Sequence, residues 1–231
     1  MTFTDEQIKI QQKERYLSCW SWNGDFDKDG YLFIKNFLDL ENLNHPKDVI
    51  PGIKEYFGNI NLWDHRNENQ VPGSSSRIKY PPYKKLYYEA KEKVENILGR
   101  KLYTTYYLDR IYYPNQQLYK HLDRDACEIS VSIHLSSNLK ENWPFKLETR
   151  TWYTNKKMKE LWKEGEEVEI LFNPGDAIIY MGCEVPHWRD PLKSRHNKLS
   201  RIFKKDDTYY HQLFFYYIFS DGDRAHCFQH V

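Results

Sequence analysis

The part of the chain after residue 100 is a succession of segments with β-strand character. These segments are rich in β-branched and aromatic residues and are bounded by Gly, Pro, Asn and Asp, which is typical of strands. The sequence predicts strands at Lys101–Tyr107, Leu108–Tyr113, Glu128–Leu135, Phe145–Tyr153, Glu167–Phe172, Ala177–Met181 and Gln212–Ser220. Because a parallel sheet would need helices alternating with its strands, this order favours an antiparallel sandwich or barrel.

Helical patterns concentrate in the first hundred residues. Tyr83–Leu98 has apolar residues at three- and four-residue spacing and ends before Gly99, so it is the clearest predicted helix. Weaker patterns predict helices over residues 5–20 and around Ile53–Phe57, and a short helical insertion at Lys156–Lys163.

The two patterns together predict a mostly β fold with N-terminal helices. With no internal repeat and no clear linker, we expect one domain over residues 1–231. Residues 1–100 would supply helical support, and residues 101–220 would form the barrel.

Composition narrows the classes of partner. The formal net charge is +1, which gives no overall field to attract nucleic acid. The four cysteines have no CxxC spacing, and no apolar run is long enough for a signal peptide or a membrane span. The sequence therefore predicts a soluble, cytoplasmic protein with reduced thiols that binds neither membrane nor nucleic acid, and it leaves the oligomeric state open.

Two segments invite a functional interpretation that the residues support only weakly. The Asp25–Gly30 pattern imitates the start of a calcium loop, but Asn36 stands where a bidentate Glu is needed, which favours a turn that leads into a strand. Residues 67–82 contain three Ser and three Pro and predict a long mobile loop, which is either a lid or an ordinary surface loop.

The triplet His121-Leu122-Asp123 places an imidazole and a carboxylate on the same side of an extended segment. Such a triplet is uninformative by itself. With 9 His and 33 acidic residues in 231 positions, about 9 × 33/231, roughly 1.3, occur by chance, and one is present. The triplet needs a partner elsewhere in the chain.

That partner is His187, which follows a Pro-Gly-Asp turn and the apolar strand Ala177–Met181. A jelly-roll barrel brings strands that are distant in sequence together, so His187 can complete a site begun at His121. Two His and one carboxylate on one face are the ligand set of non-haem Fe(II) oxygenases. By the two-residue period of a strand, Arg189 points the same way and offers a guanidinium for a carboxylate.

At this point the chain resembles the Fe(II)/2-oxoglutarate-dependent dioxygenases, and among them the prolyl-4-hydroxylase-like group. The resemblance covers roughly residues 30–220 and is carried by Tyr112, His121-Leu-Asp123-Arg124, Cys127-Glu128, Ser130, Pro174-Gly175-Asp176, Tyr180, Gly182 and His187-Trp-Arg189. It implies a double-stranded β-helix (a jelly-roll, cupin-like barrel). His121, Asp123 and His187 would hold Fe(II), and 2-oxoglutarate and O₂ would be the cosubstrates.

The sequence offers several candidates for the residue that anchors 2-oxoglutarate. The family usually places a basic residue on the last strand, whereas Tyr210–Phe219 contains neither Arg nor Lys. Arg189 is the first candidate, and Arg195 and Arg201 in the basic segment Lys193–Lys205 are the reserves. Tyr112 is expected to hydrogen-bond the cosubstrate, and its neighbour Tyr113 competes for that role.

The resulting prediction is a dioxygenase that hydroxylates an aliphatic carbon of a peptide, such as a prolyl or other side chain, or of a small molecule. The alternative is a catalytically silent cupin-like binding protein. Ordinary structural roles also remain open: His187 as a buried histidine, Asp123 as a turn cap, and Arg124 as a partner of Asp125 or Glu128. The basic segment Lys193–Lys205 is a solvated loop or a lid over an acidic substrate.

Overall fold

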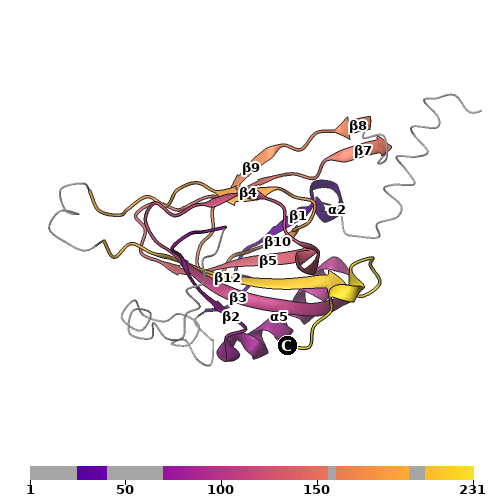
Figure 1. Cartoon of the computed structure of the whole chain (residues 1–231), viewed down its shortest axis with the longest axis horizontal. Helices are drawn as coiled ribbons and strands as arrows, with labels where there is room; N and C mark the ends of the chain where they lie inside the picture. Colours follow the sequence, from indigo (N-terminus) through magenta and orange to yellow (C-terminus); the bar gives the residue numbers. More distant parts are fainter. Residues whose placement is uncertain (1–24, 41–69, 156–159, 198–205) are drawn as a thin grey trace, which may run out of the picture.

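The computed structural model describes residues 25–40, 70–155, 160–197 and 206–231. Two antiparallel sheets face each other across the middle of this part of the chain, and helix α5 lies against the outer side of the larger sheet (Figure 1). The helices predicted over residues 5–20 and 53–57 lie outside the described residues, as does Arg201.

The larger sheet has six strands in the order β1-β10-β5-β12-β3-β2, and every neighbouring pair is antiparallel. Its strands are β1 (Tyr31–Ile34), β2 (Ser75–Ile78), β3 (Leu102–Tyr112), β5 (Ile129–Ser137), β10 (Ala177–Met181) and β12 (Tyr210–Phe219).

The smaller sheet has four antiparallel strands in the order β4-β11-β6-β9. These strands are β4 (Leu118–His121), β6 (Phe145–Glu148), β9 (Glu167–Ile170) and β11 (His187–Arg189). Strands distant in sequence are neighbours in both sheets, as the predicted jelly-roll barrel requires. A separate hairpin pairs β7 (Trp152–Asn155) with β8 (Glu160–Lys163).

Helix α5 (Lys84–Leu98) confirms the helix predicted from the apolar spacing. Its buried face includes Leu86, Tyr87, Ala90, Val94 and Leu98, and the left-handed Gly99 (φ 67°) ends it. Tyr87 packs between Phe215 and Tyr217 of β12, so the helix closes the outer side of the larger sheet. The inner side of that sheet is left to face the smaller sheet.

Alternation along β12 separates these two environments. Leu213, Phe215 and Tyr217 belong to the apolar cluster that includes α5, whereas Tyr210, Phe214 and Tyr216 belong to a second cluster with Tyr112 and Trp143. The second set lines the space between the sheets, where the metal-ligand candidates also lie.

The structure corrects several predicted boundaries. The two strands predicted at Lys101–Tyr107 and Leu108–Tyr113 are the single strand β3 (Leu102–Tyr112), because no Gly or Pro interrupts the alternation between them. The segment Phe145–Tyr153 splits into β6 and β7. The helical insertion predicted at Lys156–Lys163 is wrong for residues 160–163, which pair with β7 as a strand.

Two further segments differ from their predicted form. Residues 67–82 are not a continuous loop, because Ser75–Ile78 pairs with β3 as strand β2 and Pro81–Tyr83 forms the 3-10 helix η2. The turn predicted at Asp25–Gly30 is the short helix α2 (Asp25–Asp29), followed by Gly30 with φ 81° at the start of β1. Two remaining 3-10 helices are η3 (Asp125–Cys127) and η4 (Ala225–Cys227).

Candidate metal centre

The three predicted metal ligands lie together between the sheets. His121 ends β4 and His187 begins β11, and the register of these two strands places them directly opposite each other. Asp123 follows β4, and its backbone N–H donates to the carbonyl of Gly182 at 2.8 Å. The pairing of β4 with β11 therefore brings His121 and Asp123 next to His187.

The potential ligand atoms converge on one point. Asp123 Oδ1 is 3.6 Å from His121 Nε2 and 3.7 Å from His187 Nε2, and the two imidazole centroids are 4.3 Å apart. One ligand atom from each residue fits within a 4.8 Å span. These separations exceed ordinary hydrogen bonds and suit three atoms arranged around a common ion.

The other nitrogen of each imidazole is already engaged. His121 Nδ1 is 2.7 Å from the carbonyl of Tyr119, and His187 Nδ1 is 3.0 Å from the carbonyl of Val185. A carbonyl can only accept, so each Nδ1 carries the proton and each Nε2 keeps its lone pair. Backbone hydrogen bonds thus fix both the orientation and the tautomer that a metal ligand needs.

The Asp123 carboxylate is held by its other oxygen. The hydroxyl of Ser130 donates to Asp123 Oδ2 at 2.7 Å, which leaves Oδ1 facing the two imidazoles. Burial works to raise the pKa of Asp123, but the neighbouring His187 and His121 and the hydrogen bond from Ser130 hold it below its usual value. Asp123 is therefore an anionic donor.

Gly182 leaves the room that this carboxylate occupies. A Cβ at position 182 would collide with the carbonyl oxygen of Cys127, with Asp123 Oδ2 and with the Ser130 hydroxyl. His187 is fully enclosed, and burial lowers its pKa despite the nearby Asp123. Its ring is accordingly neutral, as coordination requires.

Arg189 points into the space between the sheets, as its two-residue spacing from His187 predicts. Its Nη1 donates to the carbonyl of Trp143 at 2.5 Å and its Nη2 to the hydroxyl of Tyr210 at 3.1 Å. The guanidinium lies 4.6 Å from the ring centres of both Trp143 and Tyr210, and only 1% of the residue is exposed. Its Nε has no hydrogen-bond partner among the described residues.

Tyr112 belongs to the same surroundings. It is fully buried, its ring meets Trp143 edge-on at 5.0 Å, and its hydroxyl accepts a 3.2 Å hydrogen bond from Arg110. Its competitor Tyr113 packs instead with Ile111 and Tyr209 in a separate small cluster. The two tyrosines thus face different environments, Tyr112 as the last residue of β3 and Tyr113 just after it.

Sequence reasoning missed two polar residues in this region. Gln212 on β12 is fully buried between Arg110 on β3 and His134 on β5, its register partners. Neither amide atom of Gln212 has a hydrogen-bond partner among the described residues. The alternation from Tyr210 could have found Gln212, because both residues lie on the inner side of β12.

Arg195 lies elsewhere and is already paired. Its Nη2 contacts Asp207 Oδ2 at 2.5 Å, and His196 Nε2 contacts the other oxygen of the same carboxylate at 2.7 Å. His196, Asp206 and Asp207 could also gather around an ion, but Arg195 already supplies a positive charge there.

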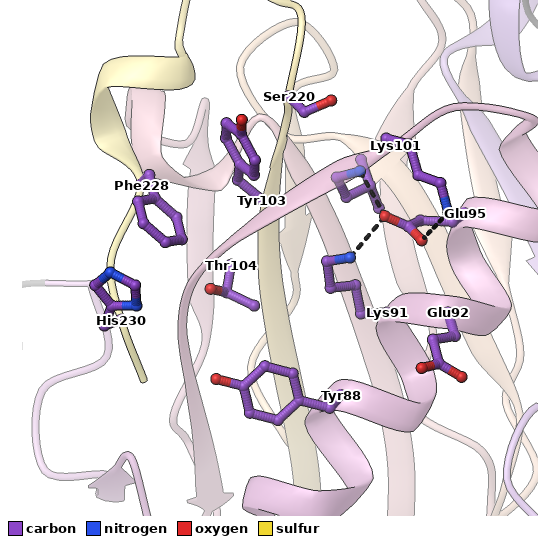
Figure 2. A pocket seen from close by; sticks show the side chains of 11 residues that line it. Tyr88, Lys91, Glu92, Glu95, Lys101, Tyr103, Thr104, Ser220, Phe228 and His230 are labelled. Atoms are coloured by element: carbon purple, nitrogen blue, oxygen red, sulfur yellow. Dashed lines mark hydrogen bonds and ion pairs between the residues drawn. The ribbon is translucent and has the colours of Figure 1, made fainter.

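Two surface pockets lie apart from the three metal-ligand candidates. A pocket of about 570 Å³ lies between α5, the start of β3 and the C-terminal residues (Figure 2). In it, Lys91 and Lys101 both point at Glu95, at 2.6 and 3.1 Å. Another pocket of about 340 Å³ is lined by Trp143, Lys193 and Arg195 among others.

No protein-family model matches the sequence, and no curated protein matches it. Solved structures do match the fold. A prolyl-4-hydroxylase from Pseudomonas putida superposes with a TM-score of 0.57 at 12% identity, over 88% of this chain and 96% of that one. SnoN, a non-haem α-ketoglutarate-dependent epimerase from nogalamycin biosynthesis, gives 0.56 at 11% identity, over 90% and 84%.

A third match is HygX from Streptomyces hygroscopicus, in a structure with nickel, 2-oxoglutarate and hygromycin B. Its TM-score is 0.53 at 13% identity, over 93% of this chain and 87% of that one. All three similarities extend over most of both chains. The chain therefore has the fold of the iron- and 2-oxoglutarate-dependent oxygenases, including the prolyl-4-hydroxylase type.

Proposed function

We propose that this protein is an Fe(II)- and 2-oxoglutarate-dependent dioxygenase that hydroxylates an aliphatic carbon of a peptide or of a small molecule. The observation that carries the proposal is the convergence of two imidazole Nε2 atoms and one carboxylate oxygen, with both Nδ1 atoms committed to backbone carbonyls. The fold also supports the proposal, because it is shared with SnoN, whose name states that it is non-haem and α-ketoglutarate-dependent, and with HygX, which has nickel and 2-oxoglutarate bound.

The donor set fits iron. Two imidazole nitrogens and one anionic oxygen, without thiolate, are the facial set of non-haem Fe(II) oxygenases, and they leave positions for cosubstrates. Fe(II) with 2-oxoglutarate and O₂ supplies an oxidant strong enough for an unactivated C–H bond, while 2-oxoglutarate becomes succinate and CO₂. The residues of the chain bind, orient and exclude water.

Arg189 is the best-supported anchor for the distal carboxylate of 2-oxoglutarate. Its guanidinium is buried among aromatic rings and retains an Nε without a partner in the described chain. Buried polar groups are normally hydrogen-bonded. A group of buried polar atoms without protein partners therefore indicates that a polar ligand binds there. The amide of Gln212 adds two more atoms of this kind.

Tyr112 and Tyr210 complete the proposed cosubstrate site. Tyr210 already receives a hydrogen bond from Arg189, and its ring stacks on His134 at 4.3 Å. Burial raises the pKa of Tyr210 to about 12, so its phenol stays protonated and can donate to a carboxylate. Arg195 is a weaker candidate because Asp207 neutralises it.

The substrate class stays broad. The names of the matching proteins include a prolyl hydroxylase, an epimerase and a carbocyclase, so different reactions are named within one fold. None of the helices in the described ranges is long and apolar enough to cross a membrane. A cytoplasmic location, a single domain over residues 1–231 and the absence of a nucleic-acid partner remain predictions from the sequence.

The proposal is tested by the turnover of 2-oxoglutarate without a primary substrate. Wild-type protein with Fe(II), ascorbate and O₂ should convert 2-oxoglutarate to succinate slowly, as measured by chromatography. Asp123→Ala should abolish the conversion because it removes the anionic ligand. Glu89→Gln, at an exposed position of α5, should not change it. Equal succinate from wild type and Asp123→Ala would refute the proposal.

A further inference from the structure

Arg124 directly follows the candidate ligand Asp123 and is exposed. The sequence left it as a possible partner of Asp125 or Glu128, but both acids bind Arg224 instead, at 3.0 and 3.1 Å. Arg124 forms no ion pair with any acid in the described ranges. A guanidinium without a counter-ion therefore lies beside the metal-ligand cluster.

Tyr106 fixes the position of this guanidinium. The guanidinium carbon (Cζ) of Arg124 lies 4.8 Å from the centre of the Tyr106 ring, which is a cation–π arrangement. The Tyr106 hydroxyl is in turn 3.1 Å from the Cys127 thiol. Arg124 is thus oriented on an aromatic surface while it stays open to solvent.

The aromatic surface continues toward the metal-ligand cluster. Tyr216, across from Tyr106 in the register of β3 and β12, has its ring centre 4.6 Å away. Burial first, and then the nearby Tyr106 and Asp123, raise the pKa of Tyr216 far above its usual value. The two rings therefore form one aromatic surface, with Arg124 over Tyr106 and with Tyr216 within the electrostatic influence of Asp123.

This surface is separate from the proposed cosubstrate site. Tyr106 and Tyr112 are both on β3, six residues apart, which is about 20 Å along a strand. Arg189 lies with Trp143 and Tyr210 at the Tyr112 end. A molecule as small as 2-oxoglutarate cannot reach both guanidiniums, so Arg124 is left for a different anion.

From this geometry, and resting on the proposed oxygenase function, we propose that Arg124 binds an anionic group of the primary substrate, a carboxylate or a phosphate. The planar fork of a guanidinium pairs with either group through two hydrogen bonds. The apolar part of the substrate lies on Tyr106 and Tyr216. Because Arg124 adjoins Asp123, the anion and the carbon to be hydroxylated belong to one small molecule.

The first test uses metal-free protein, so it does not depend on the oxygenase proposal. Phenylglyoxal should modify Arg124 faster than buried Arg189 or paired Arg224, as read by peptide mass mapping. Phenylacetate or phenyl phosphate should slow the modification of Arg124, and the neutral phenylacetamide should not. Equal protection by the amide, or no protection by either anion, would overturn the inference.

The second test uses the anaerobic Fe(II)–2-oxoglutarate complex. Phenylacetate or phenyl phosphate should perturb its visible absorption band, with phenylacetamide as the neutral control, and the stronger of the two anions identifies the charged group. Arg124→Gln should weaken that response about tenfold or more. Lys120→Gln, which changes a lysine paired with Glu148 and stacked on Trp188, should leave it unchanged.

The outcomes separate the two proposals. If the band forms but neither anion changes it, or if Arg124→Gln responds like wild type, the inference is wrong and the oxygenase function stands. If Arg124→Gln instead raises the 2-oxoglutarate midpoint tenfold, Arg124 belongs to the cosubstrate site and the inference is also wrong. If wild type forms no band, the oxygenase proposal fails, and the labelling experiment still reports whether Arg124 binds anions.

Discussion

His121 and His187 are cross-strand partners whose rings lie 4.3 Å apart, although Arg189 of the same strand pairs with Leu118. The four residues Leu118–His121 of β4 thus lie opposite the three residues His187–Arg189 of β11, which is a β-bulge. The bulge turns both Leu118 and His121 inward and leaves Tyr119 and Lys120 exposed. This irregularity allows β4 to contribute a ligand while β11 keeps both His187 and Arg189 inside.

Ser130 should contribute to metal affinity without touching the metal. Ser130→Ala removes the hydrogen bond that holds Asp123 Oδ2, so the carboxylate gains freedom to rotate. Loss of such a supporting contact typically weakens metal binding about 10- to 100-fold. Mn(II) titration by calorimetry measures the effect. Ser132→Ala is the matched control, because Ser132 is on the same strand and its hydroxyl is 3.5 Å from the hydroxyl of Tyr180 rather than hydrogen-bonded to Asp123. Equal loss of Mn(II) affinity in both variants would contradict the role of Ser130.

Substitutions of Arg189 and Arg195 should affect the binding of 2-oxoglutarate differently. A hydrogen bond to a charged group contributes about 1.5–3 kcal/mol, so Arg189→Met should raise the dissociation constant of 2-oxoglutarate about 10- to 100-fold. Arg195→Met should change it little, because Asp207 holds that side chain. Titration of the Fe(II)-loaded protein, with Mn(II) affinity as a check on folding, measures both. The reverse ranking would transfer the anchor to the basic segment.

Asp109 should be a major contributor to stability on the outer side of the larger sheet. This fully buried carboxylate accepts hydrogen bonds from Arg77 Nη2 at 2.5 Å and from His211 Nε2 at 2.9 Å, and so joins β2 and β12 to β3. Breaking a buried ion pair costs about 3–5 kcal/mol, which is the loss expected for Asp109→Asn in urea denaturation.

The matched control for that variant is Glu89→Gln. Its partner is Lys85, and both side chains are more than half exposed at a separation of 3.5 Å. Such surface pairs contribute less than about 1 kcal/mol. If the two variants lose the same stability, the buried network does not have the role described.

His134 should make stability depend on pH. Burial first, and then nearby Arg189, lower its pKa from 6.5 to about 4. Above pH 6.5 neither folded nor unfolded His134 binds a proton, whereas between about 6.5 and 4 only the unfolded form does. Stability should therefore fall with decreasing pH by about 1.4 kcal/mol per unit in this window.

The corresponding variant is His134→Phe in metal-free protein. Between pH 6.5 and 4.5 its free energy of unfolding should change less steeply with pH than that of wild type. The difference in slope should correspond to about one bound proton. His226→Gln, at an exposed position, serves as the control. An unchanged slope in His134→Phe would show that His134 is protonated in the native protein.

The barrel strands and helix α5 were predictable because their signals are local. Apolar spacing and Gly99 define Lys84–Leu98, and alternation defines β5, β10 and β12 closely. The boundary errors occurred where a local signal was weak. Ser75–Ile78 looks like a loop because Ser and Gly surround it, yet pairing with β3 makes it a strand.

The candidate site was predictable where a motif specifies it and not where only the fold does. His121, Asp123 and His187 follow a known spacing, and Arg189 follows from alternation. Gln212 and His134 carry no motif, and they meet only because β5 and β12 become neighbours. The unpaired state of Arg124 was likewise hidden, since Arg224, which takes its expected partners, lies about a hundred residues further along.

The most direct test of the oxygenase proposal is an anaerobic titration of wild-type protein with Fe(II) and 2-oxoglutarate, followed by visible absorption. It needs no primary substrate and reports the iron site and the cosubstrate together. The account predicts a weak charge-transfer band that saturates with one iron per chain and is lost in His121→Ala. Wild-type protein that binds Fe(II) but forms no band with 2-oxoglutarate, or a band that persists in His121→Ala, would contradict it.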